Sequence, residues 1–170
     1  MVQMLIATLS VLIGLSPVWP IGTNPSVGDP FIIVNKTTNR LAFYNNSKLV
    51  MDAPVATGAT NELTPEGEFT IIVKAKDPYY RKKDIPGGDP RNPLGARWIG
   101  FDAKGTDGRI YGVHGTNNPS SIGHHVSNGC IRMHNEQVIK LYDQVPIGTK
   151  IFITHSSKSF WQLAHEKGAI

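Results

Sequence analysis

Cysteine is scarce in this chain: Cys130 is the single example among 170 residues. One cysteine excludes an intramolecular disulfide framework and a zinc site built from cysteines alone. The chain must therefore be stabilised by its own core, and its length suits one compact domain. A hydrophobic content of 40% with 18% charged residues excludes a disordered chain, while 17 Gly and 12 Pro exclude a coiled coil.

Charged side chains are absent from residues 1–28. Residues 4–15, MLIATLSVLIGL, form a mostly apolar run about as long as the core of a signal peptide, shorter than a membrane span of roughly 20 residues. No basic residue precedes this run and no clear cleavage pattern follows it, so a cleaved signal, a membrane anchor and a buried N-terminal element stay open. We expect a leader that places the protein outside the cytoplasm, in the cell wall or on the outer face of the membrane.

The rest of the chain is basic, because all 17 Lys and Arg and all 13 Asp and Glu follow residue 28. Mild basicity suits nucleic acid, an anionic membrane or an anionic cell wall. The one run of three basic residues, residues 81–83, is interpreted as a solvated loop. No aromatic and basic pattern typical of a nucleic-acid platform accompanies it, so we expect no nucleic-acid partner.

Short β-favouring segments separated by turn residues dominate the chain after residue 30. The expected strands are residues 31–35, 41–44, 48–56, 67–75, 98–102, 110–114 and 150–154. Pro54 predicts a sheet edge or a bulge in the third of these. Residues 77–97 hold four Pro and three Gly and are interpreted as a long loop, which could act as a lid.

One helix is expected to begin at Asn135 as its N-cap, because apolar residues follow at helical spacing. Residues 160–170 could form a second short helix. The fold class is therefore mainly β: an antiparallel β-sandwich or partly closed barrel with one short helix. The expected organisation is a leader at 1–28, a folded domain at 29–155 and a C-terminal tail at 156–170.

Chemically reactive residues concentrate in residues 111–135, YGVHGTNNPSSIGHHVSNGCIRMHN. His114 ends an expected strand and Cys130 precedes another, so an imidazolium could lie beside the thiol and lower its pKa. Gly129 leaves room for a substrate near the sulfur, and backbone N–H groups around Cys130 could hold an oxyanion. Arg132 shares a face with Cys130 if this segment is a strand, and could clamp a carboxylate.

Each of these residues also has an ordinary alternative. A lone Cys130 is often a small buried hydrophobic residue, and Arg132 could pair with Glu136 at the helix start. A zinc site drawing on His114, Cys130 and His124 or His125 is conceivable, although the spacing fits no standard finger.

The order and spacing of these residues resemble the catalytic motif of the L,D-transpeptidase family, the YkuD-type domain. That motif is a His-Gly pair, about a dozen variable residues, Ser-x-Gly-Cys, and then Arg or Asn. The matching residues are His114, Gly115, Ser127, Asn128, Gly129, Cys130 and Arg132. Asn128 stands where many members have His. Further likeness at 56–58, 64–69, 92–95 and 146–149 extends the resemblance over roughly residues 29–154.

The resemblance implies action on peptidoglycan stem peptides in the anionic cell wall. Cys130 would attack the diaminopimelate carbonyl of a tetrapeptide stem, release D-Ala and pass the acyl group to an amine acceptor, forming a cross-link. His114 would donate and accept protons, with Ser127, Gly129 and Gly115 supporting the site. Arg132 and Asn128 would contact the substrate. The resemblance requires no metal and no organic cofactor, and we expect a monomer.

Several functions remain as alternatives. An L,D-carboxypeptidase would use the same site with water as the acceptor. A non-catalytic wall-binding module would explain the basic charge and the leader, and a structural zinc protein would use the histidines. A papain-like cysteine hydrolase is disfavoured, because its cysteine usually precedes its histidine in the chain.

Overall fold

The structure, a computed structural model, describes residues 25–170. Residues 1–24 of the expected leader lie outside the described residues. Among residues 25–170, no helix is long and apolar enough to cross a membrane.

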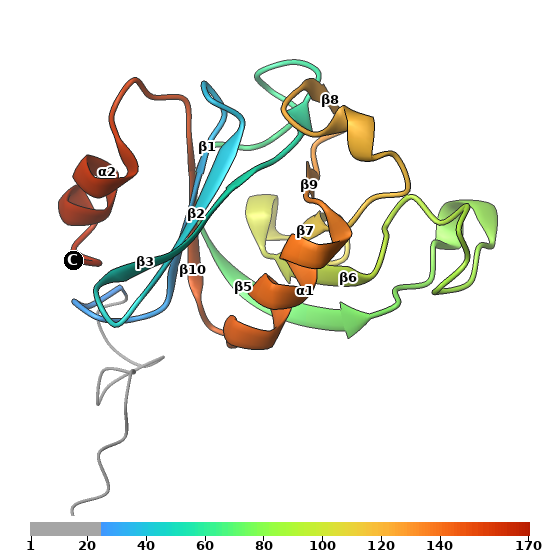
Figure 1. The fold of residues 1–170 in the computed structure, drawn as a ribbon, viewed down its shortest axis with the longest axis horizontal. Helices are drawn as coiled ribbons and strands as arrows, with labels where there is room; N and C mark the ends of the chain where they lie inside the picture. Colours follow the sequence, from blue (N-terminus) through green and yellow to red (C-terminus); the bar gives the residue numbers. More distant parts are fainter. Residues whose placement is uncertain (1–24) are drawn as a thin grey trace, which may run out of the picture.

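Ten strands and two α-helices follow one another along the chain (Figure 1). The strands are β1 Phe31–Asn35, β2 Arg40–Asn45, β3 Lys48–Pro54, β4 Thr57–Gly58, β5 Gly67–Lys76, β6 Arg97–Phe101, β7 Tyr111–His114, β8 His125–Ser127, β9 Ile131–Arg132 and β10 Lys150–Thr154. The helices are α1 Asn135–Gln144 and α2 Phe160–Glu166, with short 3-10 turns η1 Arg81–Lys83, η2 Ala103–Gly105 and η3 Pro119–Ser121.

Eight strands form one curled sheet in the order β3-β2-β1-β10-β5-β6-β7-β9, and β4 pairs with β8 in a small second sheet. The expected mainly β fold with a partly closed sheet is confirmed, and β3 with Pro54 is an edge strand as predicted. The sheet is mixed rather than wholly antiparallel, because β1 runs parallel to β10 and β7 parallel to β9. Parallel neighbours require long connections, which local sequence patterns do not indicate.

Both faces of the sheet are covered. One face carries the main core, to which α1 contributes Val138 and Leu141, and α1 packs against β6 and β7. The other face carries Phe31, Ile33 and Ala42 under α2 (Figure 1). The C-terminal tail thus forms a second helix, begun by Ser159 in a reciprocal capping arrangement with Gln162.

Candidate active site

The parallel pair β7 and β9 brings the two motif segments together. Val113 lies beside Ile131 and His114 beside Arg132 in the register of this pair. Cys130 immediately precedes β9, and the backbone of Gly112 in β7 hydrogen-bonds to its thiol. Gly112 and His114 are two residues apart on β7, so their side-chain positions share one face. The register of this pair therefore brings His114 and the Cys130 backbone to neighbouring positions of two adjacent strands.

His114 is held in one orientation inside the protein. Its imidazole is buried, its Nδ1 lies 2.6 Å from the Gly115 carbonyl oxygen, and its ring stacks on Trp98. A carbonyl only accepts hydrogen bonds, so Nδ1 carries the hydrogen and Nε2 of the neutral ring can accept a proton. Burial lowers the pKa of His114 to about 4, and the positive charge of Arg132 acts in the same direction.

Cys130 is half-buried, and its Sγ lies 3.3 Å from the Ile110 carbonyl oxygen. Burial raises the pKa of the thiol, against weaker opposite effects of the Gly112 hydrogen bond and the charges of Lys82 and Arg132. The two pKa shifts together favour a neutral thiol beside a neutral imidazole. The imidazolium–thiolate pair expected from the sequence stays a prediction, and burial acts against the charged form of each group.

The Ser-x-Gly-Cys segment is fixed by hydrogen bonds of its own. The buried Ser127 hydroxyl donates to the Cys130 carbonyl at 2.6 Å and accepts the Gly129 N–H at 3.1 Å. Gly129 has φ +129, and a Cβ there would lie 2.5 Å from the Leu63 carbonyl oxygen, so a side chain is excluded. These contacts fit the supporting roles implied by the resemblance for Ser127 and Gly129.

Asn135 holds the loop that follows His114. Its Oδ1 accepts the N–H groups of Ala96 and Thr116 at 3.1 and 3.2 Å, and its Nδ2 donates to the Thr116 carbonyl at 3.0 Å. A Cβ on Gly115 would lie 2.0 Å from Oδ1, so only glycine fits beside it. The expectation that Asn135 is an N-cap is wrong: His134 is the N-cap and Asn135 begins α1. Its side chain serves the loop instead of the helix end.

The two residues expected to contact substrate differ in setting. Arg132 is half-buried beside His114, whereas Asn128 is exposed. Across residues 25–170 no ion pair joins Arg132 to Glu136, the alternative partner considered from the sequence. Arg132 therefore lies beside His114 and forms no ion pair with the start of α1.

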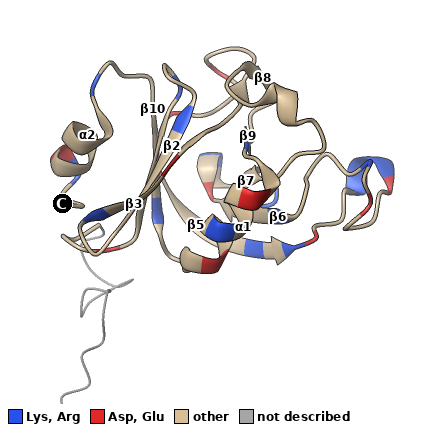
Figure 2. Cartoon of the chain, in the orientation of Figure 1, with Lys and Arg blue, Asp and Glu red and all other residues tan. Residues whose placement is uncertain are grey.

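A hollow of about 520 Å³ opens at the thiol. Cys130 lines it together with Trp98 and with three basic residues, Arg81, Lys82 and Arg109, and none of its lining residues is acidic. Arg81 and Lys82 belong to η1 in the long loop between β5 and β6, where Figure 2 shows a group of basic residues. The loop expected at 77–97 thus forms one wall of the hollow, which suits an anionic ligand.

The remaining histidines lie apart from this hollow. His125 contacts the Thr57 hydroxyl through Nδ1 at 3.0 Å, and both His124 and His125 are exposed. Within the described residues, no three His, Cys, Asp or Glu side chains gather where they could hold a metal ion.

Comparison with known proteins gives the family. Residues 29–153 match the YkuD family, described as an L,D-transpeptidase catalytic domain. YqjB of Bacillus subtilis, named among the L,D-transpeptidases, is 58% identical over 161 residues, covering 95% of this chain and 92% of that protein. YkuD of the same organism is 39% identical over 76% of this chain and 71% of its own length.

Solved structures share the fold. An L,D-transpeptidase from Mycobacterium smegmatis superposes with a TM-score of 0.58 at 22% identity, over 74% of this chain and 58% of that one. The family match spans most of the chain and includes both motif segments. The chain belongs to the YkuD family of L,D-transpeptidase catalytic domains.

Proposed function

We propose that this protein is a peptidoglycan L,D-transpeptidase with Cys130 as its nucleophile and His114 as its proton acceptor and donor. Membership of the family supports action on the cell wall. The observation that carries the proposal is the Cys130 thiol, open to a hollow and one diagonal step across the β7–β9 pair from a neutral imidazole. A thiol whose proton can pass to a neighbouring imidazole is the arrangement that nucleophilic catalysis requires.

In the first step the thiol proton moves to Nε2 of His114 as Sγ attacks the diaminopimelate carbonyl of a tetrapeptide stem. The attack forms a C–S bond and a tetrahedral oxyanion, which backbone N–H groups near Cys130 stabilise. Collapse of this intermediate breaks the bond to D-Ala, and His114 gives its proton to the departing amine. The products are free D-Ala and a thioester on Cys130.

In the second step an acceptor resolves the thioester. The side-chain amine of a neighbouring stem loses a proton to His114 and forms the new amide, which regenerates the Cys130 thiol. Water in place of the amine would give an L,D-carboxypeptidase with the same residues. The transferase is preferred because the family is that of the transpeptidases.

Positive charge around the thiol supports binding of the stem carboxylates. We assign Arg132 to a substrate carboxylate, as a guanidinium can bind it in bidentate fashion. Arg81 and Lys82, unlike Arg132, line the hollow at the thiol and attract the anionic stem before it docks. Asn128 lies exposed in the motif segment and is assigned to the peptide backbone of the substrate.

The expected site of action is the cell wall outside the cytoplasm. The uncharged residues 1–28 are assigned to export or anchoring, and the basic domain suits the anionic wall. No cofactor takes part in the proposed chemistry.

Defined muropeptides test the proposal. The protein is incubated with a disaccharide tetrapeptide, and the products are identified by mass. We expect free D-Ala and a dimer joined through two diaminopimelate residues, and neither product from Cys130→Ala with an unchanged melting temperature. Formation of the tripeptide without the dimer would show that the protein acts as an L,D-carboxypeptidase. Release of D-Ala by Cys130→Ala would refute the assignment of Cys130 as the nucleophile.

A further inference from the structure

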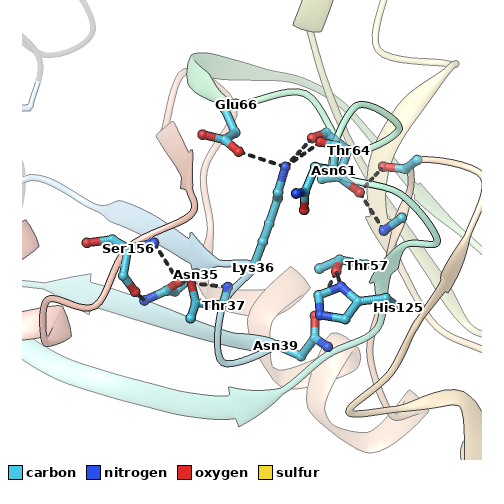
Figure 3. Close-up of polar contacts among 12 residues, drawn as sticks. Asn35, Lys36, Thr37, Asn39, Thr57, Asn61, Thr64, Glu66, His125 and Ser156 are labelled. Carbon is cyan, nitrogen blue, oxygen red and sulfur yellow. Dashed lines mark hydrogen bonds and ion pairs between the residues drawn. The ribbon is translucent and has the colours of Figure 1, made fainter.

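Lys36 is almost completely buried, which is unusual for a lysine in a hairpin turn. Its ammonium reaches three oxygens: the Asn61 carbonyl at 2.6 Å, the Thr64 carbonyl at 3.1 Å and the Glu66 carboxylate at 2.8 Å (Figure 3). Three donors meeting three acceptors satisfy the buried charge. Lys36 thereby fixes the loop between β4 and β5 to the first hairpin of the sheet.

Thr64 connects this loop to the nucleophile segment. Its buried Oγ1 accepts the Gly58 N–H at 2.8 Å and donates to the Gly129 carbonyl at 3.1 Å. Lys36 holds the Thr64 backbone on one side, and the Thr64 hydroxyl holds Gly129 on the other. A continuous series of polar contacts thus runs from β1 to the residue before Cys130.

The contact with Gly129 determines the direction of the next amide. A peptide group is planar and trans, so its C=O and N–H point in opposite directions. Holding the Gly129 carbonyl against Thr64 therefore turns the Cys130 N–H away from Thr64. Across residues 25–170 the Cys130 N–H has no backbone acceptor, which leaves it available to an oxyanion.

We propose that Thr64, held by the buried Lys36, is a positioning residue that orients the Gly129–Cys130 peptide for oxyanion stabilisation. This inference rests on the proposed function, because it concerns the acyl transfer assigned to Cys130. Gly129 lacks a Cβ and occupies positive φ, so its peptide is intrinsically free to rotate. Ser127 holds the Gly129 N–H and the Cys130 carbonyl on either side of this peptide, and Thr64 holds the peptide itself through the Gly129 carbonyl.

Thr64→Val tests the proposal, since it removes the hydroxyl and keeps the shape. We expect kcat for D-Ala release to fall by roughly 100-fold with KM little changed, and Thr64→Ser to restore most of it. Thr149→Val is the matched control: Thr149 is equally buried and donates to the Pro146 carbonyl at 2.8 Å, away from the hollow. It should retain wild-type kcat.

Alkylation of Cys130 by iodoacetamide distinguishes two reasons for a lower kcat in Thr64→Val: a misoriented Cys130 amide and a disturbed thiol. Alkylation forms no oxyanion, so Thr64→Val should alkylate at close to the wild-type rate. Equal losses of alkylation and acyl transfer would overturn the proposal, as would wild-type kcat in Thr64→Val or an equal loss in Thr149→Val.

A wild type that releases no D-Ala would refute the proposed function. Amide NMR spectra test the positioning role of Thr64 even in that case. We expect Thr64→Val to shift the Gly129 and Cys130 amide signals, and Thr64→Ser and Thr149→Val to leave them near their wild-type positions. Unshifted signals in Thr64→Val would contradict the positioning role independently of activity.

Discussion

The indole of Trp98 stacks on the imidazole of His114, with ring centroids 5.5 Å apart and planes inclined by 16°. The indole is itself anchored, because its Nε1 donates to the Gly108 carbonyl at 2.8 Å. The stacking keeps water from one face of the imidazole and contributes to the burial that lowers the pKa of His114 to about 4. The imidazole of His114 is therefore neutral at pH 7.

The first prediction concerns the ionisation of the thiol. Because burial raises the pKa of Cys130 above its ordinary value, iodoacetamide alkylation should accelerate only at alkaline pH. Cys130 is the single cysteine, so the measured rate belongs to it alone. A rate plateau between about pH 5 and 7, typical of a thiolate–imidazolium pair, would contradict the neutral pair. His114→Gln should leave the profile nearly unchanged.

The second prediction concerns stability in acid. The pKa of His114 is about 4 in the folded protein against an ordinary value of 6.5, so the unfolded chain binds more protons between these values. This contribution to stability is complete above pH 6.5 and declines as the pH falls toward 4. Between pH 7 and 4.5 the wild type should lose about 2 to 3 kcal/mol more unfolding free energy than His114→Asn, measured in urea. Equal losses of unfolding free energy in the two proteins would show that the pKa of His114 is not lowered by folding.

The third prediction concerns Lys36. Lys36→Met removes a charged donor from the Asn61 and Thr64 carbonyls and the Glu66 carboxylate, so the unfolding free energy should fall by about 2 to 3 kcal/mol. Lys48→Met, at an exposed position of β3, should change it by less than about 0.5 kcal/mol. Urea unfolding of both variants makes the comparison. Similar small effects in both would mean that the Lys36 contacts contribute little.

The fourth prediction concerns the basic wall of the hollow. Replacing Arg81 and Lys82 together by Gln should raise KM for a tetrapeptide stem several-fold and leave kcat nearly unchanged, because the charges attract substrate without joining the reaction. The dependence of kcat/KM on salt should weaken as well. Lys83→Gln is the control, because Lys83 follows in η1 but does not line the hollow. An equal rise of KM in Lys83→Gln would show that the overall charge of the protein, and not the position of Arg81 and Lys82, attracts the substrate.

The sequence predicts the strands well where apolar and β-branched residues mark them, as in β1 and β5. It does not predict the parallel pairing of β7 with β9, because that register depends on contacts across a long connection. The two-residue strands β4 and β9 are likewise too short for a periodic signal.

The motif residues around the thiol are recognisable from their spacing, whereas the residues that hold them are not. The sequence around Lys36 predicts a solvated turn, and the sequence around Asn135 predicts a helix cap. Their buried contacts arise only after distant segments meet. The sequence does not predict the lowered pKa of His114 either, because that pKa depends on burial in the folded protein.

Intact-mass spectrometry of the protein, quenched during turnover of a tetrapeptide stem, tests the central claim most directly. We predict a wild-type adduct equal to the mass of the donor stem less D-Ala, and none on Cys130→Ala. Peptide mapping should assign that adduct to Cys130. An active wild type without the adduct, or the same adduct on Cys130→Ala, would contradict a thioester at this cysteine.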